Sequence, residues 1–235
     1  MTTNVHHVPL SRGAALGMLA PVRSTRSLKR ALDVALGSAG LLAATPIAVA
    51  AGLVVALDDG APVLFRQERV GLHGKPFTLI KLRTMRDGRA TRVGHWLRRS
   101  GLDELPQLIN VLRGDMSLVG PRPLTMSEVR RLGWDDPRFE WRFRVAQGLT
   151  GPVQVLGAVS AKSSAAIERA YVRRGRFETD LAILGVTVLM LVAGRDRVRT
   201  VLRTGLKAHV EGWMSDHERE GTAQAPFAGA SLGFE

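Results

Sequence analysis

The stretch VALGSAGLLAATPIAVAAGLVVAL, residues 34–57, decides the architecture because it carries no charged side chain along its whole length. At about 1.5 Å per helical residue, it is long enough to cross the apolar core of a bilayer. Thr45 and Pro46 lie near its middle, where a proline removes a backbone donor and kinks or breaks a helix. Basic residues flank the stretch on both sides, whereas a spanning helix keeps its positive charge on one side. The pattern therefore favours a proline-broken helix that enters one leaflet and returns, over a simple span or a buried core helix.

Basic side chains outnumber acidic ones in this chain of 235 residues. The 33 lysines and arginines against 21 aspartates and glutamates give a formal net charge of +12, and the isoelectric point is about 11.4. Such a charge predicts a polyanionic partner: nucleic acid, an anionic membrane surface or a phosphorylated substrate. Aromatic residues make up only 5% of the chain, which leaves few side chains for stacking single-stranded bases. The absence of cysteine excludes a disulfide framework and thiolate chemistry.

Charge and hydropathy divide the chain into four expected segments. They are a mobile tail at 1–27, the membrane helix at 28–60, a cytoplasmic domain at 61–205 and an Ala- and Gly-rich tail at 206–235. The domain combines β-prone and helical patterns, so the predicted fold class is α+β and mostly helical.

Within the domain, the β-prone runs 63–70 and 77–82 predict a hairpin. Apolar residues at helical spacing predict an amphipathic helix over 103–113 that ends at Gly114. Further expected elements are a polar loop at 86–91, a helix from 93, helix and loop at 127–144, a short strand within 148–157 and a basic helix at 165–177.

A second apolar run occupies residues 181–194, which are too few to span a bilayer. It fits a helix at the membrane surface and, equally well, a helix of the protein core. Arginines follow at positions 195, 197, 199 and 203. We expect this basic run to face solvent or lipid headgroups rather than to take part in chemistry.

The segment 98–123 gathers the most informative polar residues. Pro106 is tolerated only in the first turn of a helix, which predicts Asp103 as the N-cap and Glu104 in the first turn. Taken alone, these two residues can be an ordinary cap and a glutamate favoured by the helix dipole. Two adjacent acids near several arginines also suit a divalent cation and a diphosphate, because Mg²⁺ binds one or two carboxylates and shares phosphate oxygens.

Several longer motifs surround this segment. They are FRQERVG at 65–71, GKPF at 74–77, KLRTM at 81–85, LDELPQLINVLRGDMSLVGPRP at 102–123 and GLTGPVQVLG at 148–157. Together with the proline-broken apolar helix, they resemble the bacterial sugar transferase family, the monotopic polyprenyl-phosphate hexose-1-phosphate transferases. The similarity covers roughly residues 28–205, which makes 61–205 the expected catalytic domain.

The resemblance implies a two-step phosphoglycosyl transfer at the cytoplasmic face of the cell inner membrane. Asp103 would attack the β-phosphorus of a nucleoside diphosphate sugar, UDP-sugar being the expected donor, so that the nucleoside monophosphate leaves. A polyprenyl phosphate, undecaprenyl phosphate in most bacteria, would then accept the sugar phosphate from the aspartate. The product would begin a membrane-linked glycan of the exopolysaccharide, capsule or O-antigen type.

The same resemblance implies roles for individual residues. Glu104 would assist Asp103 at a Mg²⁺ site or in proton handling, and both carboxylates are expected metal ligands. The basic residues expected to bind phosphate are Arg98, Arg99 and Arg122, with Lys81 and Arg83 as second-tier candidates. The helix broken at Thr45 and Pro46 would hold the site at the depth of the lipid phosphate. Expected partners are the nucleotide sugar, the polyprenyl phosphate and membrane lipids, and a homodimer is left open.

The chain departs from the family pattern in two places within the matched region. Gly157 is followed by Ala158 where relatives usually have Gly-Arg, and the 86–91 segment is shorter than in many relatives. The chain also lacks the multi-span N-terminal module of the larger relatives, so we expect a minimal catalytic form.

Two other functions stay open on the sequence alone. One is a basic nucleic-acid-binding protein, which the net charge suggests and the few aromatics and the apolar helix disfavour. The other is a catalytically inactive membrane scaffold of the same fold, which the intact Asp103-Glu104 pair disfavours.

Overall fold

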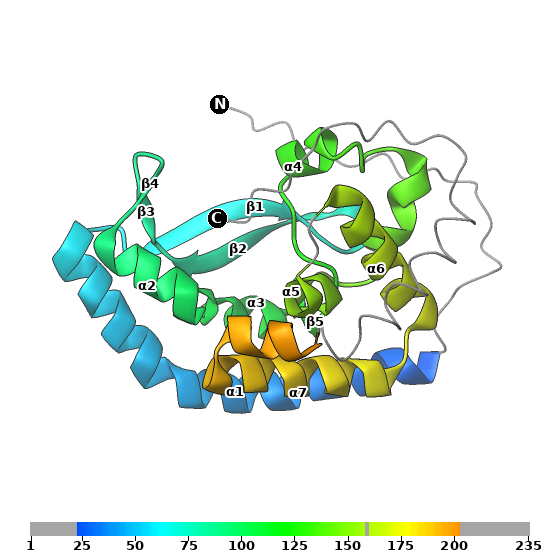
Figure 1. The fold of residues 1–235 in the computed structure, drawn as a ribbon, viewed down its shortest axis with the longest axis horizontal. Coiled ribbons are helices and arrows are strands. Elements are labelled where there is room, and N and C mark those ends of the chain that lie inside the picture. The colour runs from blue at the N-terminus through cyan, green and yellow to red at the C-terminus, as the bar shows by residue number, and fades with distance from the viewer. Residues whose placement is uncertain (1–22, 158–159, 203–235) are drawn as a thin grey trace.

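The computed structural model describes residues 23–157 and 160–202 of the chain. Its long helix α1 (Arg23–Asp59) lies beneath a body of short helices and small sheets (Figure 1). The body contains β1 (Leu64–Val70), η1 (Leu72–Gly74), β2 (Pro76–Leu82), β3 (Met85–Arg86), β4 (Arg89–Ala90), α2 (Arg92–Ser100), η2 (Leu102–Glu104), α3 (Gln107–Arg113), β5 (Ser117–Val119), α4 (Met126–Arg131), η3 (Pro137–Arg144), β6 (Gly148–Thr150), α5 (Pro152–Leu156), α6 (Ala161–Arg174) and α7 (Phe177–Ala193), where η marks a 3-10 helix. The predicted α+β, mostly helical class is confirmed.

Helix α1 is continuous, with Pro46 inside it. The expected interruption at Thr45 and Pro46 is a bend rather than a break: the first part of α1 runs along the base of the molecule and the last part rises at an angle (Figure 1). Proline kinks a helix without ending it when neighbouring hydrogen bonds remain, and the Thr45 hydroxyl donates to the Leu41 carbonyl oxygen at 2.6 Å. In the part of the chain that the structure describes, Ser27–Asp59 is the one helix long and apolar enough to cross a membrane.

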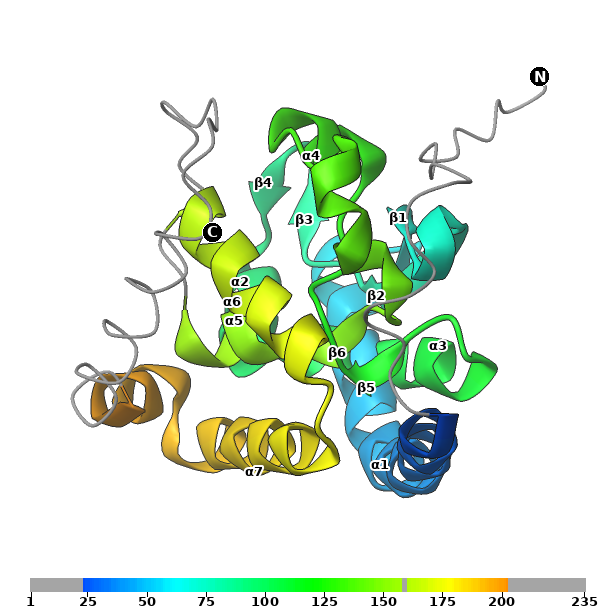
Figure 2. The ribbon, with the colours of Figure 1, turned by 90° about the vertical axis from the view of Figure 1, so that its right-hand side faces the viewer.

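Helices α1 and α7 lie side by side at the bottom of Figure 2, and the rest of the body lies above them. Both expose many large apolar side chains. We call these exposed residues the apolar base: Leu28, Val34, Leu36, Leu42, Ile47, Val49, Leu53, Val54 and Leu57 of α1, with Leu181, Val188, Leu189, Leu191 and Val192 of α7. Exposed apolar side chains in this number mark a membrane or partner contact, and the length and hydropathy of Ser27–Asp59 point to the membrane. Helix α7 fits both expected readings in part: Ile183 and Met190 belong to the largest buried apolar cluster of the body, while the apolar side chains on its other side are exposed.

Both ends of α1 are fastened to the same body. Near its start, the Lys29 ammonium forms an ion pair with Asp180 of α7 at 2.6 Å, and the Arg30 guanidinium caps the carboxyl end of α3 by donating to the carbonyl oxygens of Val111 and Leu112 at 2.6 and 2.7 Å. At its end, the Asp59 carboxylate pairs with Arg83 and Arg86 at 2.8 and 2.9 Å. The bent helix therefore leaves the body and returns to it.

The predicted hairpin is confirmed as the antiparallel pair β1–β2, whose register runs from Leu64 opposite Leu82 to Val70 opposite Pro76. Two smaller sheets were not expected. The polar loop predicted at 86–91 contains the two-residue pair β3–β4, and β5 pairs with β6 in parallel.

Several element bounds differ from the sequence patterns. The run 148–157 is strand only over β6, because Pro152 occupies the first turn of the helix α5 that follows. Helix α6 begins at Ala161, ahead of the expected 165, because Ser160 caps it in a capping box with Ser163. Helix α1 already begins at Arg23, inside the expected tail at 1–27. The rest of that tail, the tail at 206–235 and Ala158 lie outside the described residues.

Three buried apolar clusters hold the body together, and one of them packs Ala51 and Val55 of α1 against Leu82 of β2 and Leu97 of α2. The largest joins α3, β5, α5 and α7 through residues that include Val111, Met116 and Val119, and the remaining one surrounds Trp134 and Phe143 beneath α4 and α6. The three clusters flank the turn between α2 and α3 and the turn after β5, which carry the expected site residues.

Candidate active site

The turn between α2 and α3 carries Asp103 and Glu104. Gly101 ends α2 in the left-handed conformation, with φ +78°, and its amide donates to the Leu97 carbonyl oxygen at 2.8 Å. The chain then forms the 3-10 helix η2, and α3 begins only at Gln107, after Pro106. The expected role of Asp103 as the N-cap of a helix over 103–113 is therefore wrong. Asp103 lies inside the tight turn, because Gly101 reverses the chain earlier than the apolar periodicity indicates.

The Asp103 side chain is a buried carboxylate with no ordinary structural role. The residue is 4% exposed, and within the described residues no other group donates a hydrogen bond to its carboxylate. Burial raises the pKa of Asp103 to about 6, Glu104 beside it adds to the rise, and Lys81 and Arg195 act in the opposite direction. A partly desolvated acid that titrates near neutrality beside a second carboxylate is typical of a reactive site.

Lys81 reaches this turn from β2. Burial lowers the pKa of its ammonium, and the carboxylates of Asp103 and Glu104 oppose that effect, which shows that all three lie close together. The Lys81 amine also lies 5.4 Å from the centre of the Phe65 ring on β1. The hairpin therefore presents a positive charge to the acid pair.

The other predicted phosphate-binding residues divide into two groups. Arg98, in the last turn of α2, is among the charges that lower the pKa of Lys81, so it lies near that lysine. Arg99, next along the helix, is exposed. Arg83 lies elsewhere: besides its ion pair with Asp59, it donates to the carbonyl oxygens of Asp59 and Gly60, both at 2.7 Å, and so holds the end of α1.

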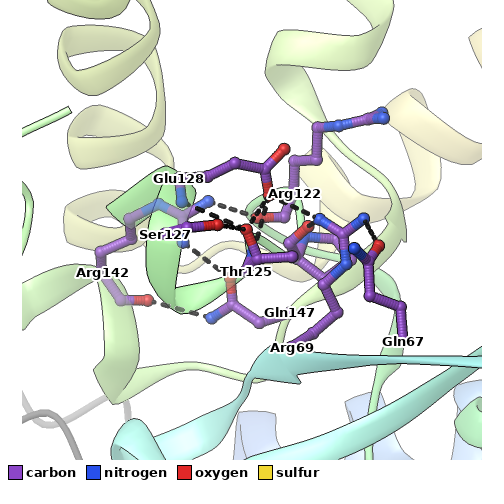
Figure 3. Close-up of polar contacts among 9 residues, drawn as sticks. Gln67, Arg69, Arg122, Thr125, Ser127, Glu128, Arg142 and Gln147 are labelled. Carbon is purple, nitrogen blue, oxygen red and sulfur yellow. Dashed lines mark hydrogen bonds and ion pairs between the residues drawn. The ribbon is translucent and has the colours of Figure 1, made fainter. Parts of the chain in front are cut away.

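Arg122 is exposed in the Gly-Pro-Arg-Pro turn after β5, and Figure 3 shows it beside Arg142. The Glu168 carboxylate accepts a hydrogen bond from the Arg122 amide at 3.1 Å, and the Arg142 guanidinium donates to the Arg122 carbonyl oxygen. Arg142 and Glu168 form an ion pair at 2.7 Å with side chains only 1% and 2% exposed. This buried pair fixes the backbone of Arg122 while its side chain extends away from the network.

The charges of Arg122, Arg69 and Lys81 act on one another in sequence, and Lys81 in turn interacts with the acid pair. Burial lowers the pKa of Arg69 on β1 and the charge of Arg122 lowers it further, while Arg69 in turn lowers the pKa of Lys81. We call Arg122, Arg69, Lys81 and Arg98 the basic track. Arg69 is locked in place by Glu128 at 2.7 Å and by the Pro123 carbonyl oxygen at 3.1 Å. Phosphate groups bind where such fixed cations converge.

The sequence patterns missed Arg69, Arg142, Glu168 and Arg195. Their partners lie far away along the chain, so no local spacing marks them. Arg195 was expected among the outward-facing arginines after the second apolar run, yet it acts on Asp103.

Comparison with known proteins shows to which family this chain belongs. The family model for bacterial sugar transferases matches residues 24–194. The UDP-glucose:undecaprenyl-phosphate glucose-1-phosphate transferase of Caulobacter vibrioides is 46% identical over 145 residues, 55% of this chain and 54% of that protein. The uncharacterized sugar transferase EpsL of Bacillus subtilis is 41% identical over 175 residues, 68% of this chain and 85% of that protein.

A protein of Escherichia coli, also named UDP-glucose:undecaprenyl-phosphate glucose-1-phosphate transferase, is 40% identical over 146 residues, 56% of this chain and 32% of that protein. The matched region is thus about half of the Caulobacter protein and about a third of the E. coli protein. Because the family model covers the acid pair, the basic track and both helices of the apolar base, this chain belongs to the bacterial sugar transferase family.

Proposed function

We propose that this chain transfers a sugar 1-phosphate from a nucleoside diphosphate sugar to a polyprenyl phosphate, through a covalent intermediate on Asp103. The observation that carries the proposal is the buried Asp103 carboxylate, whose pKa of about 6 leaves it ionised at neutral pH beside the cations of the basic track. The names of the relatives from Caulobacter and E. coli support UDP-sugar as donor and undecaprenyl phosphate as acceptor.

In the first step, an oxygen of the Asp103 carboxylate attacks the β-phosphorus of the donor. The bond between that phosphorus and the oxygen that bridges the two phosphates breaks, and the nucleoside monophosphate leaves with the bonding electrons. Lys81 and Arg98 neutralise charge on the phosphoryl oxygens as it shifts toward the leaving group. Burial suits this chemistry, because a desolvated carboxylate is a stronger nucleophile than a hydrated one.

In the second step, an oxygen of the polyprenyl phosphate attacks the same phosphorus and releases the Asp103 carboxylate. The product is a polyprenyl diphosphate sugar, and the aspartate returns to its starting state. Arg122 lies along the basic track from the acid pair, so it is suited to bind a second phosphate while the first occupies Asp103. Such a product would initiate a membrane-linked glycan.

Asp103 and Glu104 would hold the Mg²⁺ ion that the family resemblance implies. The described residues contain no group of three or more His, Cys, Asp or Glu side chains placed to bind a metal. A pair of carboxylates nevertheless fits Mg²⁺, which completes its coordination with phosphate oxygens and water. The mutual repulsion that helps to raise the pKa of Asp103 is also what a divalent cation would relieve. When bound, the ion would neutralise the diphosphate oxygens and favour departure of the monophosphate.

The arrangement of α1 supports a monotopic, re-entrant attachment at the cytoplasmic face of the inner membrane. A spanning helix places its ends on opposite sides of the bilayer, about 30 Å apart, whereas Lys29 and Asp59 are both ion-paired to the body. The bend at Pro46 would then lie within one leaflet, with the apolar base toward lipid. With this attachment, the acid pair would lie near the membrane surface, where a lipid-borne phosphate meets a soluble donor.

The decisive experiment uses the full chain in nanodiscs with undecaprenyl phosphate and a panel of nucleotide sugars. We expect release of the nucleoside monophosphate with at least one donor, and formation of a lipid-linked diphosphate sugar. The Asp103→Asn variant should release no monophosphate even without the acceptor, while Asp135→Asn, at an exposed position, should behave as wild type. Turnover by Asp103→Asn at the wild-type rate would rule out the covalent mechanism.

A further inference from the structure

Arg195 lies on a helical segment that leaves α7 and folds back toward the body. Gly194, with φ +90°, closes α7 through a hydrogen bond from its amide to the Met190 carbonyl oxygen at 3.1 Å. Residues 195–202 are helical again, and Figure 1 shows this segment, in orange, directly above α7. It begins immediately after the region that the family model matches, residues 24–194.

This segment is docked on the body by one face. Val198 is 5% exposed and belongs to the largest apolar cluster, and the Arg199 guanidinium donates to the Gln154 carbonyl oxygen of α5 at 2.7 Å. Residues three and four positions apart share a helix face, so Arg195 lies on the face that Val198 and Arg199 turn inward. Arg197 is exposed and provides a cation of the same segment that is not on that face.

The Arg195 guanidinium rests against the turn that carries the acid pair. It occupies the space that a Cβ at Gly101 would need, so it packs on the backbone two residues before Asp103. Its charge opposes the rise in the pKa of Asp103. Within the described residues its N–H groups make no hydrogen bond or ion pair, although the side chain is half-buried. A guanidinium presents a fork of donors matched to phosphate oxygens, and here that fork lies close enough to the Asp103 carboxylate for its charge to act on it.

We propose that Arg195 is a substrate-binding residue that donates hydrogen bonds to oxygens of the phosphoryl group in place at Asp103. This inference rests on the proposed function of the same site. The phosphoryl group at Asp103 would thus contact Lys81 from the hairpin and Arg195 from the segment after α7. The phosphate that benefits can be that of the nucleotide sugar or that of the lipid acceptor, since both present the same oxygens.

The test compares Arg195→Ala and Arg195→Lys with the matched control Arg197→Ala, each in the full chain in nanodiscs. A hydrogen-bonded ion pair to phosphate is worth about 10- to 100-fold in affinity. We expect Arg195→Ala to raise KM by that factor, Arg195→Lys to restore part of the loss through its charge, and Arg197→Ala to stay within about twofold of wild type. Monophosphate release without acceptor reports on the donor phosphate, and KM for undecaprenyl phosphate reports on the acceptor phosphate.

Two further measurements separate binding from a structural role. The melting temperature of Arg195→Ala should match that of Arg197→Ala, because the guanidinium makes no hydrogen bond to the described residues. Titration with UDP, followed by the thermal shift, should show weaker binding by Arg195→Ala if the donor phosphate is the ligand. KM values within about twofold of wild type for both substrates overturn the inference. If wild-type protein turns over no donor, the proposed function fails and the inference fails with it.

Discussion

The apolar base and the Arg142–Glu168 ion pair depart from the usual distribution of side chains in opposite directions. In the base, apolar residues are exposed: Leu57 and Val192 are 88% and 82% exposed. Under the Arg122 turn, charges are buried: Arg142 is 0% and Glu168 is 2% exposed. Both arrangements cost stability in water, the first by hydrating apolar surface and the second by desolvating charge. We infer that each serves a task other than folding: contact with lipid at the base, and a fixed Arg122 backbone at the turn.

The largest effect is expected from breaking the buried pair. Glu168→Ala leaves the Arg142 guanidinium buried without its counterion, which should lower the free energy of unfolding by about 3–5 kcal/mol. Denaturant titration followed by tryptophan fluorescence can measure this, because the Arg142 guanidinium lies 5.1 Å from the centre of the Trp134 ring. Glu178→Ala, at an exposed position on α7, is the control and should cost less than about 0.5 kcal/mol.

Replacing both partners sharpens the same comparison. The double variant Arg142→Met, Glu168→Leu removes two buried charges together, so its stability should lie much closer to wild type than that of Glu168→Ala. Its activity should still fall, because the amide and carbonyl groups of Arg122 lose their partners. Full activity in a stable double variant would show that the pair does not position Arg122.

A charge in the apolar base is expected to weaken membrane binding rather than folding. Leu42, on α1 before the bend, is 78% exposed, so Leu42→Lys should leave the body intact. A lysine in the apolar layer costs about 2.5–3.5 kcal/mol, which corresponds to roughly a 100-fold loss in partition to vesicles. Sedimentation with liposomes measures it.

The control for Leu42→Lys is Leu72→Lys, at the tip of the β1–β2 hairpin, where the side chain is 36% exposed and outside the base. This variant should sediment with liposomes as wild type does. Equal losses for the two variants would contradict the assignment of the base.

Some features of the molecule were predictable because they depend on local sequence. The long uncharged run of α1, the β1–β2 hairpin and the stop at Gly114 follow from hydropathy, strand propensity and the left-handed conformation of glycine. The motif around Asp103 identified the family. Each of these features depends on residues that are neighbours along the chain, so it can be predicted without knowledge of the fold.

Other features depend on contacts between distant residues, which no periodicity reveals. Arg83 has the charge of a phosphate ligand, but the fold brings it to Asp59 instead. Arg195 follows an apolar run, so the sequence predicts that it faces lipid headgroups or solvent. The chain turns at Gly194 instead, and the Arg195 guanidinium packs against Gly101. Asp103 was placed at a helix cap because Pro106 marks a first turn, whereas Gly101 had already started a separate 3-10 turn. In each case a single glycine or ion pair decided the outcome.

Asp103 is a buried acid, like Glu168. We infer that its burial serves the proposed phosphoryl transfer rather than the stability of the fold. Its pKa is raised from 3.8 to about 6, so folding favours the protonated acid and ionisation costs stability. The stability of the wild type should therefore fall as the pH rises from about 4 to 6 and stay constant above. Asp103→Asn removes this cost, and should be more stable than wild type by up to about 3 kcal/mol at pH 7 and equal to it near pH 4.

Denaturant titrations at the two pH values test that expectation, and Asp135→Asn should show no such dependence. The rate of monophosphate release by the wild type should rise with pH as Asp103 ionises, because the carboxylate is the nucleophile, and with Mg²⁺ bound the midpoint should lie below about 6, because the cation favours the ionised form. A less stable Asp103→Asn variant at pH 7 would mean that the carboxylate has a stabilising partner in the folded state.

The smallest effect is expected at the end of α1, where two arginines share one carboxylate. Arg83 and Arg86 both pair with Asp59, but their side chains are 12% and 58% exposed. Exposed ion pairs contribute little, so Arg86→Ala should cost less than about 1 kcal/mol. Arg83→Ala should cost more, because the Asp59 and Gly60 carbonyl oxygens also lose their donor. If instead the two variants unfold alike, the return of α1 to the body does not depend on Arg83.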